Sequence, residues 1–283
     1  MPLGHTGGFF VSSVLHLTCC MAERKVALDS TRRSAPQILE QVMKNGREEL
    51  ERSSHALAFS GVAGGLTMGL TGLSVAIARS LFSAGPAQDF IPQLLYPLGF
   101  IAVIIGRAQL FTENTLYPVI LVLDDRRHLG NMLRLWGIVF VSNVIGALLF
   151  ALLAIRTPAL RPEYAQELIK LGTEALHSPA GHIFWSGVIG GWLIALVAWM
   201  VSASHWTIGQ IAIVWMVTFV VGLGHFAHCI ATSGEILAAV VGGVASPGEY
   251  FHWILLATLG NIAGGVTIVS LLNYGQVHAG EEG

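Results

Sequence analysis

Two short polar segments interrupt apolar stretches in the two halves of this 283-residue chain. The first is Gly106–Thr115, GRAQLFTENT, and the second is Gly222–Glu235, GLGHFAHCIATSGE. Together they hold a guanidinium, two carboxyls and two imidazoles, groups that are costly at the depth of a bilayer and usually functional there. Interrupted helices in corresponding halves of a chain are typical of a transporter's substrate site. The pairing therefore predicts a transport site within a membrane.

His225 is the first candidate for a role in that site. A small carboxylate or nitrite loses its hydration at an apolar constriction, so it needs a positive potential or a proton to cross. An imidazole titrates near neutral pH and could supply either. The proton would pass to the acid, which then crosses uncharged, or stay on the ring while an anion passes. The plain alternative is a structural histidine whose hydrogen bonds are satisfied.

Thr112 and His228 are further candidates in the same two segments. Thr112 is expected to open a half-helix, where free backbone N–H groups can hold an anion, and its hydroxyl could orient His225. It would equally serve as a helix N-cap. His228 follows His225 by three residues and would share its face on a regular helix, although an interrupted helix does not guarantee this.

Three charged residues accompany these groups. Arg107 and Glu113 either form a buried ion pair that pins the loop, or act separately as an anion attractor and a filter at the entrance. Glu235 either pairs with a basic group or caps a half-helix that begins near Ile236.

Composition is that of a membrane protein. Only 11% of the residues are Asp, Glu, Lys or Arg, 53% are hydrophobic, and the mean hydropathy is +0.66, whereas about 25% of a soluble domain is charged. A hydrocarbon core of about 30 Å requires roughly 20 apolar residues per helix. Six such spans are predicted, the second and fifth of them broken: residues 56–82, 91–123, 132–155, 181–203, 207–243 and 250–273.

Basic residues predict which side each connection faces, because Lys and Arg are enriched in cytoplasmic loops. Ten lie before the first span or around the connection from the second to the third, whereas four lie on the opposite side. Both termini should therefore be cytoplasmic. The predicted domains are a cytoplasmic N-terminal tail (1–55), a six-span channel domain (56–274) and a cytoplasmic C-terminal tail (275–283).

The two halves repeat one another. SGVAGGL at Ser60–Leu66 in the first span is similar to SGVIGGW at Ser186–Trp192 in the fourth, and NVIGA at Asn143–Ala147 in the third is similar to NIAGG at Asn261–Gly265 in the sixth. Three spans per repeat force the halves into opposite orientations, which brings the broken spans together near the midplane. The expected fold is therefore all-α, with six transmembrane helices in two inverted three-helix repeats.

The N-terminal tail contains one patterned segment, Ser34–Ser54. Its spacing of apolar residues predicts an amphipathic helix that lies on the membrane surface or on a neighbouring subunit, or is simply solvated. The residues on the predicted apolar face are Ile38, Leu39, Val42 and Leu50. The connection between residues 157 and 180 is expected to be polar and to lie outside the membrane.

No disulfide, cofactor or nucleic-acid partner is expected. Cys19 and Cys20 are adjacent and Cys229 lies inside a span, so the three cysteines suggest no disulfide framework. No basic cluster is interleaved with aromatic residues as nucleic-acid binding requires. The N-terminal stretch lacks the features of a signal peptide, and translation begins at either Met1 or Met21.

Several motifs resemble the formate/nitrite transporter family. They are LFTENT at Leu110–Thr115, GLGH at Gly222–His225 and GNIAGG at Gly260–Gly265, and the resemblance runs from about Pro36 to Asn273. It implies an aquaporin-like six-span protomer with two broken helices, assembled as a homopentamer with one pore per protomer. It also implies an integral protein surrounded by lipid in a bacterial inner (plasma) membrane.

The resemblance also assigns residues to the pore. Tyr96 and Phe100 fall on apolar positions of one constriction, and Leu110 and Phe111 fall on the constriction of the first loop. With Arg107 at the entrance, these residues would form the permeation path.

Thr112 falls on the threonine that faces the family's central pore histidine, and His225 falls on that histidine. The pattern departs from the family nearby, because Gly224 stands where an acidic residue usually precedes the histidine and Cys229 stands where an asparagine usually follows it.

Further departures concern charge. The family tends to carry a lysine shortly before the fourth span, whereas this chain has EALHSP at Glu174–Pro179, with His177 as a stand-in. Arg107 and Glu113 replace residues that are mostly small in the family. The resemblance therefore carries the fold over but does not separate formate, nitrite, acetate, lactate and hydrosulfide as substrates.

Other functions fit the residues less well. An intramembrane enzyme could use His225, His228 and Glu235 as metal ligands or the serine of ATSG at Ala231–Gly234 as a nucleophile, but no HExxH spacing or oriented base is present. A neutral-solute pore of the aquaporin type would need paired Asn-Pro-Ala loops. A closed pore with an interaction role is a third alternative. The sequence favours a non-enzymatic channel or proton-linked transporter for a small monovalent anion or its conjugate acid.

Overall fold

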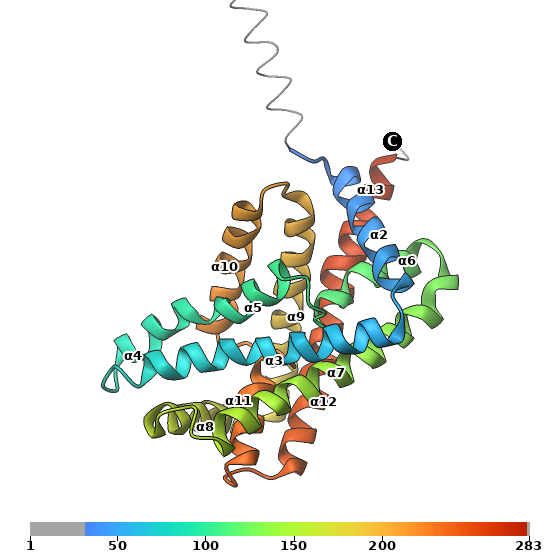
Figure 1. The fold of residues 1–283 in the computed structure, drawn as a ribbon. Helices are drawn as coiled ribbons and strands as arrows, with labels where there is room; N and C mark the ends of the chain where they lie inside the picture. The colour runs from blue at the N-terminus through green and yellow to red at the C-terminus, as the bar shows by residue number, and fades with distance from the viewer. Residues whose placement is uncertain (1–31, 282–283) are drawn as a thin grey trace, which may run out of the picture.

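The computed structural model describes residues 32–281, which fold into helices joined by short connections (Figure 1). The questions about Cys19, Cys20 and the start at Met1 or Met21 concern residues outside this range. The helices of the first half are α2 (Ala35–Glu51), α3 (Ser54–Arg79), α4 (Pro86–Phe90), η1 (Ile91–Leu95), α5 (Pro97–Ile105), η2 (Glu113–Thr115), α6 (Tyr117–Asp124), η3 (Arg126–His128) and α7 (Leu129–Arg156). Those of the second half are α8 (Pro162–Leu176), α9 (Ala180–Ala203), α10 (Thr207–Leu223), α11 (Ala231–Val241), α12 (Pro247–Ala263), a π-helix (Gly264–Leu271) and α13 (Leu272–Glu281).

Five helical stretches are long and apolar enough to cross a membrane. Helices suit this environment because every backbone group inside one is hydrogen-bonded without water. The five stretches are Ser54–Arg79, Pro86–Ile105, Arg126–Arg156, Ala180–Ala203 and Pro247–Ala279. The span expected at 207–243 is divided into α10 and α11, of 17 and 11 residues, each shorter than a single crossing requires.

The helix in the second expected span is also interrupted. Helix α5 ends at Ile105 and α6 begins at Tyr117, with an irregular segment and the short η2 helix between them. We name residues 106–116 the first interruption and residues 224–230, between α10 and α11, the second interruption. Both lie in the segments that the sequence singled out.

Asn143 on α7 holds the first interruption in place. Its side-chain oxygen accepts a hydrogen bond from the backbone N–H of Phe111 at 2.9 Å. Its amide nitrogen donates to the carbonyl of Gln109 at 2.8 Å and to that of Gly61 on α3 at 2.7 Å. A single buried amide thus satisfies an N–H and a carbonyl that the broken helix leaves unpaired, and its third hydrogen bond ties the interruption's support to α3.

Asn261 on α12 does the same for the second interruption. It accepts from the backbone N–H of Cys229 at 2.9 Å and donates to the carbonyls of Ala227 and Gly187, each at 2.8 Å. Asn143 and Asn261 are both fully buried. These asparagines are the first residues of the NVIGA and NIAGG motifs, so the repeated motifs support the two interruptions in the same way.

Glycines allow the helices that carry these asparagines to approach closely. A Cβ atom on Gly65 of α3 would lie 2.0 Å from the Asn143 carbonyl oxygen, and one on Gly191 of α9 would lie 2.1 Å from the Asn261 carbonyl oxygen. Only a residue without a side chain permits such contact. The glycine motifs therefore fix the distance between α3 and α7 and between α9 and α12.

The predicted amphipathic helix of the tail is present as α2, which lies beside α6 (Figure 1). Its apolar face packs on this chain's own α6 and α9. Leu39, Val42 and Leu50 are buried there, whereas Ile38 is only partly buried. Gly46 brings the helix against the backbone of Tyr117 at the start of α6. The tail helix is thus an integral part of the protomer.

Helix α8 was not expected, because residues 157–180 read as a polar connection. It packs on α11 and α3 (Figure 1), and its Gly172 lies against the backbone of Glu235. This contact matches the one between α2 and α6. Each half therefore begins with an amphipathic helix that covers the half-helix following its interruption.

Candidate transport path

Two cavities lie on opposite sides of the interruptions. The first, which we name the α2-side cavity, has a volume of about 300 Å³. Its polar lining includes Arg33, Asn45, Glu49, Arg107, Glu113 and His205. The second, the α8-side cavity, has a volume of about 330 Å³ and includes Tyr96, Glu174, His182, His225, Phe226 and Glu235 in its lining.

A closed constriction separates the cavities. Phe100, Leu110, Thr112 and His228 are each at most 1% exposed. The Phe100 ring lies edge-on to the His228 ring with centroids 5.0 Å apart. Leu110 belongs to the lining of the α2-side cavity, and Tyr96, which contacts Phe100, belongs to the lining of the α8-side cavity. These residues form an apolar barrier with one polar pair inside it.

That polar pair joins the two interruptions. Thr112 Oγ1 and His228 Nε2 are 2.8 Å apart, and both side chains are fully buried. His228 Nδ1 accepts a hydrogen bond from the backbone N–H of Ala231 at 3.0 Å. Because Nδ1 is an acceptor, Nε2 carries the ring proton and donates to the Thr112 oxygen. The hydroxyl proton of Thr112 is then left to donate to a third group.

His225 is not the partner of Thr112, contrary to the alignment of GLGH with the family motif. It is exposed in the α8-side cavity, with its backbone in the left-handed region at φ 49°. His228 is the histidine that faces Thr112. It is preceded by Ala227. The two asparagine motifs could have revealed this. Asn143 bonds Phe111 and Asn261 bonds Cys229, so the residues just before these, Leu110 and His228, hold equivalent positions in the two halves.

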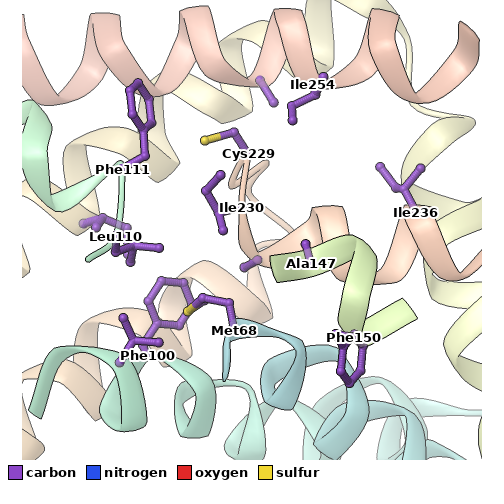
Figure 2. Close-up of a cluster of buried hydrophobic side chains, with 14 of the residues drawn as sticks. Met68, Phe100, Leu110, Phe111, Ala147, Phe150, Cys229, Ile230, Ile236 and Ile254 are labelled. Atoms are coloured by element: carbon purple, nitrogen blue, oxygen red, sulfur yellow. The ribbon is translucent and has the colours of Figure 1, made fainter. Parts of the chain in front are cut away.

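Phe111 does not line either cavity. Its ring packs against Trp136 and Phe140 of α7, with centroids 5.7 Å and 5.1 Å apart. Figure 2 shows Leu110 and Phe100 close together near Met68, while Phe111 points away from them. Phe111 therefore anchors the first interruption to α7 and is not the constriction residue that the resemblance implied.

Arg107 and Glu113 line the α2-side cavity without forming the ion pair that was the first of the two alternatives for them. Among the described residues, no ion pair joins them. Arg107 is exposed and has a left-handed backbone with φ 58°, as His225 has in the other half. The two interruptions thus present one basic side chain to each cavity.

The ion pair on the α8 side involves other residues. Arg79 of α3 donates to both carboxylate oxygens of Glu174 at 2.8 Å and 3.2 Å, and its Nε lies 3.5 Å from Glu167. Burial alone would raise the pKa of Glu174 on α8, but the hydrogen bond and charge of Arg79 outweigh burial and lower it. Glu174 is therefore a stable carboxylate whose charge is matched.

Glu235 neither caps a helix nor joins this ion pair. It lies within α11, which begins at Ala231, and its side chain is 8% exposed and lines the α8-side cavity. No cluster of three histidine, cysteine or acidic side chains that could hold a metal occurs within residues 32–281. The geometry is that of two cavities separated by a constriction, each lined by a titratable carboxyl group, Glu113 on the α2 side and Glu235 on the α8 side.

Comparisons with known proteins agree with this geometry. Residues 36–275 match the family model for formate/nitrite transporters. The inner membrane protein YfdC of Escherichia coli is 32% identical over 259 residues, which is 90% of this chain and 83% of that protein. A probable formate transporter of Methanothermobacter thermautotrophicus is 31% identical over 195 residues, covering 63% of this chain and 71% of its own length.

Solved structures share the fold. An ion channel of the same family superposes with a TM-score of 0.76 at 19% identity, covering 86% of this chain and 98% of the channel. A pentameric formate channel with formate bound superposes with a TM-score of 0.68 at 17% identity, covering 80% and 98%.

Proposed function

Because this chain belongs to the formate/nitrite transporter family, we propose that it conducts small monovalent anions, or their conjugate acids, across the constriction between its two cavities. The family consists of transporters and channels rather than enzymes. The observation that carries the proposal is the buried pair of Thr112 and His228, which places an unused hydroxyl donor inside an apolar barrier. Formate and nitrite are the first substrates to test.

The proposed architecture is six crossings in two inverted three-helix repeats, with the half-helices α5 and α6, and α10 and α11, each completing one crossing. Its support is the matched bonding of Asn143 and Asn261 to the two interruptions. Residues 56–274 would form the channel domain. The relative with a bound formate is a pentamer and the relative in Escherichia coli is an inner membrane protein, so we assign a homopentamer in an inner membrane to this chain as well.

The proposed orientation places both termini in the cytoplasm. It rests on the excess of basic residues on the side of α2. Helix α13 packs beside α2 (Figure 1), so the C-terminus lies on the same side of the protomer. The α2-side cavity then opens towards the cytoplasm and the α8-side cavity towards the outside.

The pair selects by hydrogen bonding rather than by charge. A weak acid or anion that enters the apolar barrier loses water, and the Thr112 hydroxyl replaces one of the lost hydrogen bonds. His228 supports that role because its Nε2–H donates to the hydroxyl oxygen of Thr112. The Thr112 hydroxyl can then donate its own proton to the cargo. The Nδ1 of His228 is held by the Ala231 N–H, so gaining a proton there would break a buried hydrogen bond.

Uptake into proteoliposomes tests the proposal. Flux of labelled formate and nitrite would be measured at pH 5.5 and 7.5 for the wild type, Thr112→Val, His228→Gln and, as the matched control, His225→Gln. A hydrogen bond contributes about 0.5 to 1.5 kcal/mol with a neutral acid and about 1.5 to 3 kcal/mol with an anion, so Thr112→Val should reduce flux by a factor between roughly 2 and 100. His228→Gln should act in the same direction, whereas His225→Gln should leave most of the flux in place.

Two results would count against this function. The first is the absence of formate or nitrite flux from wild-type protein that is folded and pentameric. The second is an equal loss of flux in His225→Gln and Thr112→Val, which would move the site from the constriction to the α8-side cavity.

A further inference from the structure

One carboxyl group lies on each side of the constriction without a hydrogen bond or ion pair from the described residues. Glu113 lines the α2-side cavity, and Glu235 lines the α8-side cavity. A carboxylate removed from water and left without a partner is costly, and a carboxylate at the mouth of an anion path repels its cargo. Glu113 and Glu235 therefore do not serve to attract a bare anion, and their place beside the path needs another explanation.

Glu113 has charged neighbours that are engaged elsewhere. Glu49 of α2 accepts hydrogen bonds from the Gln109 amide at 2.6 Å and from Arg52 at 3.1 Å. Arg33 donates to the carbonyl of Ser202 and contacts His205. Besides these groups, the charged or titratable side chains facing Glu113 in the cavity are Arg107 and Tyr117.

Glu235 has a comparable setting. The nearby cation, Arg79 of α3, is bound to Glu174 and Glu167 of α8. The other titratable groups that line its cavity are Tyr96 before α5, His182 of α9 and His225 of the second interruption. Gly72 of α3 and Gly172 of α8 leave space for this side chain and its backbone, since a Cβ on either would meet Glu235 at 2.6 Å or 2.2 Å.

His228, the histidine in the constriction, is poorly placed to exchange protons with a cargo. Its Nδ1 accepts from a backbone N–H, and its Nε2 proton is committed to Thr112. Giving up that proton would leave an imidazole anion in an apolar barrier, a charge with no partner. A proton that neutralises the cargo must therefore come from the solution or from another group that lines a cavity.

We propose that Glu113 and Glu235 are the two proton-exchange residues of the path, converting a carboxylate or nitrite anion to its neutral acid at one mouth and regenerating the anion at the other. This inference rests on the proposed function. At the entry side the glutamic acid O–H bond breaks, and its proton forms the O–H bond of the cargo acid. The glutamate that remains takes a new proton from water in its cavity.

The neutral acid then passes Phe100, His228, Thr112 and Leu110 and gives its proton to the glutamate of the opposite cavity, which releases it to water. Proton transfer between two carboxyl groups joins partners of similar acidity, so it is fast when they are within hydrogen-bond reach. The cycle moves one proton with each anion and is electrically neutral.

The arrangement makes each carboxyl sensitive to the pH on its own side. Glu235 equilibrates with the solution on the α8 side and Glu113 with the solution on the α2 side. A substitution at one position should therefore alter the response to pH on one side of the membrane. A packing role would not produce this separation.

Vesicles of a single orientation, selected through an affinity tag at the C-terminus, allow the two sides to be tested separately. Formate flux, proton uptake and current would be measured while the pH of each side is changed between 5.5 and 7.5. The variants are Glu235→Gln and Glu113→Gln, which keep the shape of the side chain but cannot exchange a proton. Glu163→Gln on α8 and Glu48→Gln on α2 are matched controls, because both carboxyls are exposed.

We expect wild-type flux to carry one proton per formate with no net current. Glu235→Gln should lower flux about tenfold at pH 7.5 on the α8 side and much less at pH 5.5, where the solution supplies more of the conjugate acid. Glu113→Gln should show the same pattern for the α2 side. Glu235→Asp, which restores an exchangeable proton, should recover part of the wild-type pH profile.

Three results would overturn the inference. A wild-type current equal to the formate flux would show that bare anions cross, while leaving the proposed function intact. A loss of flux by the same factor at both pH values would identify the two glutamates as structural. An absence of any wild-type flux of small acids would remove both this inference and the proposed function.

Discussion

The two interruptions share a backbone arrangement but differ in nearly every side chain that matters for chemistry. In both, an asparagine bonds one N–H and two carbonyls, and a basic residue adopts a left-handed backbone. Yet Leu110 occupies the position that His228 has in the other half, and Thr112 occupies that of Ile230. The repeat supplies the scaffold, and the polar pair requires one residue from each half.

This division explains why the two cavities have different linings although the two interruptions share a backbone arrangement. The scaffold residues are buried amides and glycines, for which any change is costly in both halves. The residues facing the cavities differ between the two halves, although the interruptions keep the same backbone support. The following predictions test the equivalence of the two halves, starting with the contacts that should have the largest effect.

Removing either scaffold asparagine should cause the largest loss of stability. Asn143→Ala and Asn261→Ala each leave one carbonyl and one N–H of an interruption unpaired in the interior, and each also removes a second bond to a carbonyl of α3 or α9 that is already inside a regular helix. Each unpaired group costs about 1 to 3 kcal/mol, so each variant should lose at least about 2 kcal/mol. Reversible denaturation in mixed detergent micelles measures the loss.

Asn273→Ala is the control for these variants, because its amide makes one hydrogen bond, to the Val269 carbonyl at 2.9 Å, in a partly buried position. Equal losses for Asn143→Ala and Asn261→Ala would support equivalent scaffolds. A large loss in only one of them would show that one interruption is held by other contacts.

The glycine contacts should come next. Gly65→Ala and Gly191→Ala would place a Cβ against the carbonyl oxygens of Asn143 and Asn261, so the paired helices would have to separate. Overpacking of this kind costs about 1 to 3 kcal/mol. Gly137→Ala on α7 is the control, since its Cβ would meet nothing within 4 Å. Thermal unfolding followed by size-exclusion chromatography would rank the three variants.

Much of this scaffold could be predicted from the sequence, and the family resemblance is confirmed by the comparisons. The motifs that carry Asn143 and Asn261 are repeated, and repeated motifs indicate repeated contacts. Hydropathy does not indicate whether the imidazole of His225 or that of His228 points into the protein, because the left-handed backbone of His225 changes the direction of the residues that follow it. The GLGH motif therefore predicted His225 as the partner of Thr112, whereas aligning the two halves on Asn143 and Asn261 points to His228.

Other features depend on tertiary contacts that local sequence does not encode. The lack of an ion pair between Arg107 and Glu113 among the described residues follows from the path of the first interruption. Helix α8 differs, because its apolar residues recur at helical spacing and that periodicity could have predicted it. Leu168 and Leu171 are buried there, yet prolines and charges dominate the segment around them. Phe111 shows the same limit, because its neighbours on α7 are distant in sequence.

The left-handed residues should give a smaller effect, of opposite sign. Arg107→Gly and His225→Gly remove a left-handed penalty of about 1 to 2 kcal/mol but add flexibility to the unfolded chain, worth about 0.5 to 1 kcal/mol. Both variants should therefore gain roughly 0.5 to 1 kcal/mol. Ala102→Gly, at an exposed position of the α5 helix, should instead lose about 1 kcal/mol in the same denaturation assay. A loss of stability in His225→Gln and His225→Gly alike would point to a stabilising role of the imidazole itself.

The smallest expected effect concerns the turns that precede α7 and α12. Ser246 caps α12 with a hydroxyl, whereas Asp125 before α7 uses a carboxylate that accepts from the Arg127 side chain at 2.7 Å and from its backbone N–H at 3.0 Å. The hydrogen bonds from Arg127 lower the pKa of Asp125 to about 2.

A carboxyl with a depressed pKa stabilises the folded state above the pKa of the unfolded chain, which is about 3.9 for aspartate, and loses that contribution as the pH falls through the folded value. The difference in unfolding temperature between the wild type and Asp125→Asn should therefore be constant from pH 7 to about 5 and vanish towards pH 2. Asp124→Asn removes an equal charge without the bonds to Arg127 and should show a smaller difference at pH 7. An Asp125→Asn difference that persists at pH 2 would mean that the carboxylate charge does not act at this turn.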